Sequence, residues 1–173
     1  MTSDNPQQRP APRPPGKVTA AYVERAALAY LERFSSSAEN LRRVLVRKVE
    51  RRCRLRDEEP EPFLPLVDEA LRRMVESGLV DDRRYAEARA ASLRRRGGSA
   101  RLIRAKLAAK GVEREAAAAA LASDTDESER AAAKALARRR RLGPHRSHDR
   151  AAYRDKDMAA LVRAGFSYGL ARS

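Results

Sequence analysis

The sequence has no tryptophan, a single cysteine and only 5% aromatic residues. Much of its 42% hydrophobic content is alanine, so the chain has little material for a deep globular core. Its one cysteine, Cys53, excludes a disulfide framework within the chain and fits a reducing compartment. These shortages favour thin layers of helices, each of which buries one apolar stripe.

Long apolar runs are also missing. None approaches the roughly 20 residues that a membrane-spanning helix needs, and the N-terminus lacks the apolar stretch of a secretory signal. We therefore expect no membrane partner and a cytoplasmic location. Negative charge is scarce as well, because 24 acidic residues stand against 38 basic ones and leave a net charge of +14. Such an excess attracts phosphate backbones and acidic protein surfaces, although a solvated arginine-rich surface is the plainer alternative.

Patterns of catalysis and ligand binding are missing too. The sequence has no glycine-rich loop that cradles phosphates, no set of metal ligands and no combination of Ser, His and Asp for nucleophilic catalysis. We interpret His145 and His148 as polar loop residues and Cys53 as a small helix residue. The sequence therefore predicts a protein that is not an enzyme and needs no cofactor or metal.

The sequence does contain a helical pattern, which covers nearly the whole chain after a Pro-rich N-terminal tail. Apolar residues recur at intervals of three and four, and nothing alternates with period two, so no sheet is expected. The apolar faces are expected to include Phe34, Val75 and Val162. Serines and aspartates suited to cap helix starts alternate with glycines suited to end them. Nine helices are predicted, beginning near Thr19, Ser37, Pro65, Asp82, Ser99, Glu113, Glu129, Asp149 and Ser167.

The pattern is also self-similar. Segments 41–49, 103–112 and 158–166 each form an amphipathic stretch that ends at a cap and an apolar residue. The offset is 62 residues from Leu45 to Leu107 (107 − 45) and 54 from Gly111 to Gly165 (165 − 111). Nine helices then sort into three units that must stack to bury their faces. We predict an all-α fold of three tandem three-helix repeats in an elongated, curved array. Its parts are a disordered tail at 1–17 and repeats at 18–80, 81–122 and 123–173.

The same residues carry a resemblance to the RecX family, the regulators of the RecA recombinase. It covers the chain from about Ala20 to the C-terminus. The matching pieces are Ala27–Leu31 with Ser37 and Leu41, then Gly78–Ala86, then Gly98 with Ile103, Leu107, Lys110 and Gly111, then Arg163–Ser167. The sequence departs from the family pattern in the inserted loop Asp57–Pro65 and in Ala164, where the family has a basic residue.

The resemblance implies three tandem three-helix repeats that bind along the groove of a RecA filament on single-stranded DNA. The implied outcome is inhibition of RecA: less filament growth, ATP hydrolysis, strand exchange and co-protease activity. The implied partners are the RecA filament and single-stranded DNA, touched directly or through RecA. We expect the protein to act as a monomer.

Basic residues gather in three clusters that could bind a polyanion, and arginine predominates because its fork suits phosphate and carboxylate. Gly97 and Gly98 interrupt the main cluster, so the backbone there could approach a phosphate or a partner closely. That main cluster, in the second repeat, is Arg94, Arg95, Arg96, Arg101, Arg104, Lys106 and Lys110. A second cluster is Arg42, Arg43, Arg47, Lys48, Arg51 and Arg52, and a third is Arg138, Arg139, Arg140 and Arg141 with Arg146.

Two other functions stay open at this level. A stand-alone DNA- or RNA-binding protein would hold naked oligonucleotides tightly without any dependence on RecA. A helical scaffold for an acidic protein would keep its partner after nuclease treatment. Each basic cluster could also be only a solvated helix face.

Overall fold

The structure, a computed structural model, describes residues 15–172. The predicted tail falls mostly outside the described residues, but its last part is held by the fold. Arg52 donates a 2.5 Å hydrogen bond to the Gly16 carbonyl, and Arg56 donates one of 2.8 Å to the Pro15 carbonyl. Residues 15 and 16 therefore lie against the end of the second helix.

Within residues 15–172 the chain forms nine α-helices, two short 3-10 turns and no strand. The helices are α1 (Ala20–Leu31), α2 (Ala38–Arg54), α3 (Leu64–Glu76), α4 (Asp82–Arg95), α5 (Ala100–Ala109), α6 (Arg114–Ala119), α7 (Asp126–Arg140), α8 (Arg150–Arg163) and α9 (Tyr168–Arg172). The turns are η1 (Glu61–Phe63), inside the loop predicted at 57–65, and η2 (Gly143–His145).

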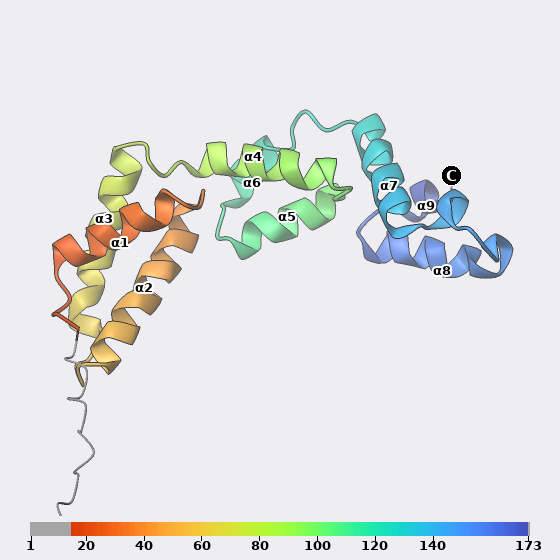
Figure 1. Ribbon diagram of the computed structural model, residues 1–173. Coiled ribbons are helices and arrows are strands. Elements are labelled where there is room, and N and C mark those ends of the chain that lie inside the picture. The colour runs from red at the N-terminus through yellow and green to blue at the C-terminus, as the bar shows by residue number, and fades with distance from the viewer. Residues whose placement is uncertain (1–14, 173) are drawn as a thin grey trace, which may run out of the picture.

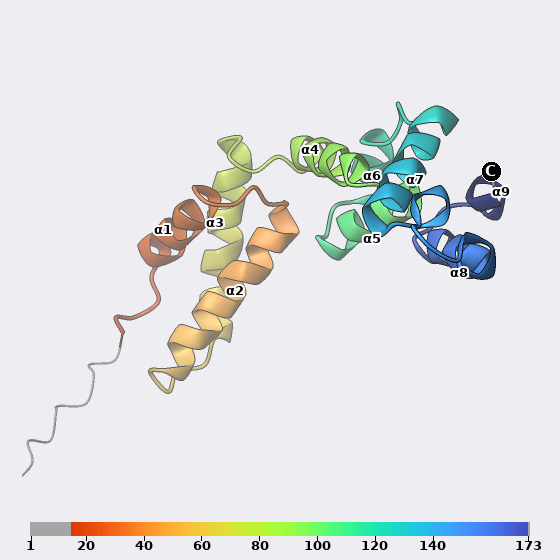
Figure 2. The same cartoon turned by 45° about the vertical axis from the view of Figure 1, so that its right-hand side comes forward.

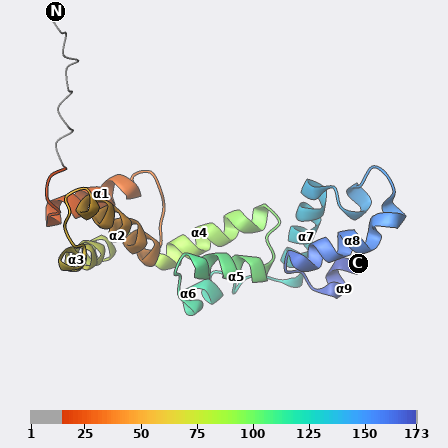
Figure 3. The ribbon, with the colours of Figure 1, turned by 90° about the horizontal axis from the view of Figure 1, so that it is seen from below.

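The helices form three groups in a row, α1–α3, α4–α6 and α7–α9 (Figure 1). A turned view and a view from below show the same succession, with the described N-terminal end and the C-terminus at opposite ends of the body (Figures 2 and 3). The predicted all-α fold of three tandem three-helix repeats in an elongated array is thus confirmed. The repeat boundaries at residues 80/81 and 122/123 stay a prediction.

Each group has a small hydrophobic cluster of its own. The first contains Leu41, Leu45 and Val67, and the second contains Ile103 and Leu107, all of them fully buried. The third is reduced to Ala132, Ala133, Leu136 and Phe166. Because the three clusters are separate and shrink toward the C-terminus, the body depends on its junctions as well as on its cores.

Local sequence signals set the helix ends as expected. The side chains of Ser37, Asp81 and Ser99 accept hydrogen bonds from the first-turn amides of α2, α4 and α5. Gly111 and Gly165 follow α5 and α8 with φ of 74° and 95°, a left-handed conformation that glycine adopts without strain.

Four local predictions are wrong. Phe34 and Val75 are 49% and 47% exposed, since α1 ends three residues before Phe34 and Val75 faces away from the first cluster. Val162 is 39% exposed because α9, only five residues long, does not cover that side of α8. Helix α7 begins three residues earlier than predicted, at Asp126, since Thr125 and Ser128 form a reciprocal capping box.

The third group is held partly by a buried carboxylate. Asp157 is the one buried residue of α8, and its oxygens accept a 2.8 Å hydrogen bond from the Gly143 amide and bonds of 3.0 and 2.6 Å from Arg146. The hydrogen bond from Arg146 is the main cause that lowers the pKa of Asp157 below its ordinary value, against the opposing effect of burial. Asp157 thus ties the loop after α7 to α8.

We predict that Asp157→Asn lowers the free energy of unfolding at pH 7 by about 2 kcal/mol, the usual scale for a hydrogen bond to a charged group. A carboxyl with a lowered folded-state pKa stabilises above its unfolded-state pKa of about 4, and that stability disappears as the pH falls through the folded-state value. Urea unfolding from pH 3 to pH 8 should therefore show a gap between wild type and variant that closes in acid. Asp155→Asn, an exposed change on the same helix, should leave no gap, and an Asp157→Asn gap of equal size at pH 3 would contradict the assignment.

Candidate nucleic-acid interface at the junctions between repeats

Adjacent repeats are joined by a serine hydroxyl. The Oγ of Ser37 donates a hydrogen bond to the carbonyl of Lys110, and the Oγ of Ser99 donates one of 2.7 Å to the carbonyl of Ala164. Both serines are 0% exposed. Lys110 and Ala164 are the C-cap residues of α5 and α8, so each serine caps its own helix and binds the end of the middle helix of the next repeat.

A carboxylate completes each junction from the first helix of the following repeat. The Ala38 amide at the start of α2 donates a 2.7 Å hydrogen bond to Asp82, and the Ala100 amide at the start of α5 donates bonds of 3.2 and 3.3 Å to Glu129. Helices α8, α5 and α2 therefore meet end to end, with the C-terminus of one at the N-terminus of the next. Their dipoles align favourably in this arrangement.

A glycine allows the helix ends to come this close. A Cβ atom on Gly111 would lie 2.4 Å from the Cβ of Glu39, and one on Gly165 would lie 2.5 Å from the Oγ of Ser99. The two junctions thus use the same device: a buried serine, a carboxylate and a glycine without a side chain. We call this arrangement the serine clasp.

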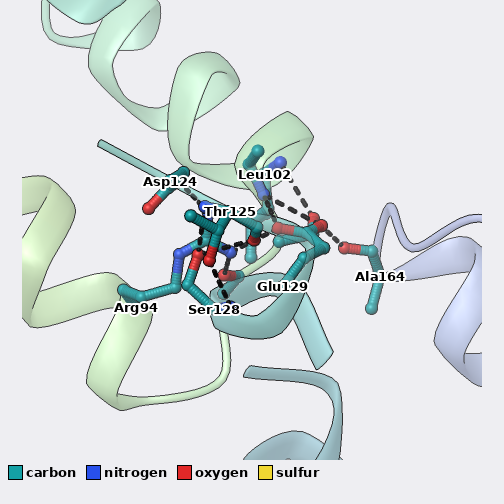
Figure 4. Close-up of polar contacts among 10 residues, drawn as sticks. Arg94, Leu102, Asp124, Thr125, Ser128, Glu129 and Ala164 are labelled. Carbon is teal, nitrogen blue, oxygen red and sulfur yellow. Dashed lines mark hydrogen bonds and ion pairs between the residues drawn. The ribbon is translucent and has the colours of Figure 1, made fainter. Parts of the chain in front are cut away.

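Arg94 strengthens the second clasp (Figure 4). Its guanidinium donates hydrogen bonds to Asp124, to Glu129 at 2.5 Å and to the Gly98 carbonyl at 2.9 Å. Burial alone would lower the pKa of Arg94, but the hydrogen bonds that it donates to both carboxylates raise it above its ordinary value. Arg94, predicted to bind a partner, is thus 15% exposed and has its partners within the chain.

Gly97 and Gly98 also serve the second junction. A Cβ on Gly97 would lie 2.6 Å from the amide nitrogen of Leu136 and 2.8 Å from the carbonyl oxygen of Ala132, both on the backbone of α7. The sequence suggested that the backbone here could approach a phosphate or a partner. The close approach that the structure shows is to α7 of the third repeat.

Five more of the predicted binding residues also have partners within the chain, including Arg52, which donates to the Gly16 carbonyl, and Arg146, which binds Asp157. Arg42 forms a 2.7 Å ion pair with Asp68, and this hydrogen bond raises the pKa of Arg42 above its ordinary value. Arg43 binds Glu39 and the Ala109 carbonyl, and the Nζ of Lys110 donates a 3.0 Å hydrogen bond to Asn40.

Twelve predicted binding residues are exposed and make no ion pair or side-chain hydrogen bond with another residue of 15–172. They are Arg47, Lys48, Arg51, Arg95, Arg96, Arg101, Arg104, Lys106, Arg138, Arg139, Arg140 and Arg141. Their part in binding stays a prediction, but their charge is available to a partner.

The fold brings four of these twelve together in a hollow of about 400 Å³ where the second and third repeats meet. Arg96 is the C-cap of α4, Lys106 lies on α5, and Arg139 and Arg140 lie on α7. None of the residues described as lining the hollow is acidic. The cationic members of the lining are Arg89, Arg96, Lys106, Arg139, Arg140 and Arg163. We call this the basic hollow. Arg95, Arg101, Arg104 and Arg138 do not line it.

Arg89 and Arg163 are not among the predicted binding residues, because each stands outside the arginine runs. Helical spacing could have indicated both residues. Arg89 lies two turns before Arg96, the C-cap of α4, and so faces the same side of that helix. Arg163 lies one turn after Ala160, another residue of the lining, on α8. Spacing places two residues on one face, but it does not show which faces of different helices meet.

A larger hollow of about 1010 Å³ lies between α7, α8 and α9. Its lining mixes carboxylates, such as Asp126 and Asp157, with cations, such as Lys134 and Arg154. It therefore lacks the single sign of charge that marks the basic hollow.

Three small helical units, clasped end to end and carrying unpaired cations, define a basic helical-repeat protein. No helix in the described part of the chain is long and apolar enough to cross a membrane. Comparisons with known proteins narrow this class. Residues 81–121 match the family model described as RecX, second three-helix domain. A protein of Myxococcus xanthus (strain DK1622) named "Regulatory protein RecX" is 42% identical over 164 residues, which cover 93% of this chain and 88% of that protein. This chain belongs to the RecX family.

Two crystal structures share the fold. RecX from Lactobacillus salivarius aligns with a TM-score of 0.65 at 23% identity, over 88% of this chain and 91% of that one. A second structure, titled regulatory protein RecX, aligns with a TM-score of 0.64 at 23% identity, over 87% of this chain and 68% of that one.

We predict that Ser99→Ala destabilises the protein by about 2 kcal/mol, because it removes a helix cap and leaves the part-buried Ala164 carbonyl without its donor. Thr125→Ala is the matched control, since Thr125 caps only its own exposed helix start, and it should cost about 1 kcal/mol. Denaturant unfolding measures both. Limited proteolysis should cut Ser99→Ala between the second and third repeats, and equal losses in the two variants would argue against the clasp.

Gly97→Ala tests the contact between α4 and α7. Gly78→Ala provides the matched control, since the φ of 71° at Gly78 is close to the 78° of Gly97 but no atom lies within 4 Å of a Cβ placed on Gly78. Gly78→Ala should cost about 1–2 kcal/mol from left-handed strain alone. Gly97→Ala should cost at least about 3 kcal/mol because the α7 backbone must also move. Thermal unfolding that ranks the two variants equally would contradict this contact.

Proposed function

We propose that this protein inhibits the RecA recombinase by docking in the groove of the RecA filament on single-stranded DNA. The observation that carries the proposal is the 42% identity, over nearly the whole chain, to a protein named "Regulatory protein RecX". The expected setting is the cytoplasm, in recombinational DNA repair and the SOS response, and the protein acts as a non-enzymatic monomer.

The shape and charge of the chain suit this role. A row of three clasped repeats presents a longer surface to a helical filament than one repeat alone would (Figure 1). Its unpaired cations are available to DNA phosphate or to acidic filament surface. The proposed mechanism is steric and electrostatic: the bound array obstructs the groove and holds neighbouring protomers in one state.

The test is DNA-dependent ATP hydrolysis by RecA with increasing amounts of added protein. Turnover should fall to a small fraction near a fixed ratio of protein to RecA, and the inhibition should weaken as salt screens the cations. An unrelated protein of the same net charge controls for simple masking of DNA. The protein should also co-sediment with RecA filaments.

Unchanged turnover at stoichiometric excess, together with no co-sedimentation, would refute the proposal. Tight binding to naked oligonucleotides that added filaments do not compete away would instead favour a stand-alone nucleic-acid-binding protein.

A further inference from the structure

We propose that the basic hollow binds the phosphodiester backbone of single-stranded DNA directly, without RecA. This deepens the proposed function, on which the choice of a DNA partner partly rests. The hollow lies between α4, α5, α7 and α8, and each of these helices contributes at least one cation to it.

Helix ends do not explain the charge. Three helices end at the hollow, α4 at Arg95, α7 at Arg140 and α8 at Arg163, and arginines commonly stabilise the negative end of a helix dipole. Each end contributes about half a negative charge, so the three together contribute about −1.5. Against the six positive side chains of the lining this leaves a net charge of roughly +4.5.

This positive charge is uncompensated within residues 15–172. None of the six cations forms an ion pair or a side-chain hydrogen bond there, in contrast to Arg94, two residues before Arg96. Like charges held together repel one another, and an anion in the hollow relieves that repulsion. The arrangement is thus less favourable in the free protein than with an anion bound.

The apolar walls distinguish a single strand from other anions. Leu93, Leu102 and Leu136 also line the hollow, Leu102 half-buried and the other two nearly buried, and the volume of about 400 Å³ is of the size that holds a small organic ligand. A single strand can place its phosphates against the guanidinium groups and lay a sugar or a base against the apolar part of the lining, chiefly Leu102. A duplex keeps its bases stacked inside, so its phosphates alone would reach the rim.

The serine clasp makes the site rigid. Ser99 holds the end of α8, and Gly97 lets α4 pack directly on α7, so the elements that carry the cations are fixed before a ligand arrives. Binding then does not have to order these elements, which favours affinity.

The test measures binding of a fluorescent oligothymidylate by anisotropy, without RecA, at several salt concentrations. The hollow variant is Arg96→Ala, Arg139→Ala and Arg163→Ala together. Each phosphate contact to a single strand contributes about 0.7 to the slope of log K against log salt, so losing three contacts should make the slope shallower by about 2. The same relation predicts binding about 100-fold weaker at 0.1 M salt.

The matched control removes the same charge elsewhere. Arg25→Ala, Arg114→Ala and Arg154→Ala change three exposed, unpaired arginines outside the basic hollow. This variant should keep the salt slope of the wild-type protein. Equal losses of affinity and slope in the two variants would overturn the inference, because net charge rather than the hollow would then govern binding.

A second variant guards against misfolding. Replacing the same three arginines by lysine keeps the charge, so it should retain most of the slope, while circular dichroism checks the helicity of every variant. A hollow variant with normal helicity and wild-type affinity for the strand would overturn the inference.

The RecA assay separates the two proposals. If the wild-type protein binds the strand through the hollow but leaves ATP hydrolysis by RecA unchanged, the inference holds and the proposed function fails. If it represses RecA but shows no measurable affinity for the naked strand, the inference fails, and the cations face an acidic filament surface instead.

Discussion

The structure depends on one recurring interaction, a buried serine hydroxyl that joins the start of one helix to the end of another. Ser37 and Ser99 each accept a bond from their own helix and donate one to a carbonyl more than sixty residues later. A buried carbonyl without a partner costs about 1–3 kcal/mol, so even the part-buried carbonyls of Lys110 and Ala164 can lose a large part of what a small repeat supplies. Because the third hydrophobic cluster has only four buried residues, its repeat depends on such contacts to hold its place in the row.

The sequence predicted half of this interaction. Both serines stand where helix N-caps were expected, and their separation of 62 residues (99 − 37) equals the offset found between Leu45 and Leu107. The repeat is therefore visible in the sequence alone. The donor role of the same hydroxyls is not, because a cap is a local pattern, whereas the carbonyls of Lys110 and Ala164 are reached only through the tertiary fold. The glycines show the same limit, since their left-handed backbone was expected but the α7 backbone beside Gly97 was not.

For the candidate site, the charged residues can be identified from the sequence, but the groups that surround them cannot. Arg94, Arg95 and Arg96 look equivalent in the sequence, yet successive residues of a helix point about 100° apart. Arg94 consequently meets Asp124 and Glu129, whereas Arg96 lines the basic hollow. Neither outcome follows from the run itself, because the carboxylates that neutralise Arg94 lie about thirty residues later, in another repeat.

The two junctions share one device but differ in charge. At the first, Arg43 is paired with Glu39 and Lys110 donates to Asn40, so the cations nearest the clasp are engaged within the chain. At the second, Glu129 and Asp124 form ion pairs with Arg94. The residues that line the basic hollow include no carboxylate to pair with its cations. Joining repeats therefore needs only the serine, the glycine and one carboxylate, and the remaining surface of a junction is free to differ. Since a ligand in the hollow would contact α4 and α5 of one repeat and α7 and α8 of the next, its binding free energy would also hold the two repeats together. The serine clasp fixes how adjacent repeats pack, and the cations around it determine what the junction between them can bind.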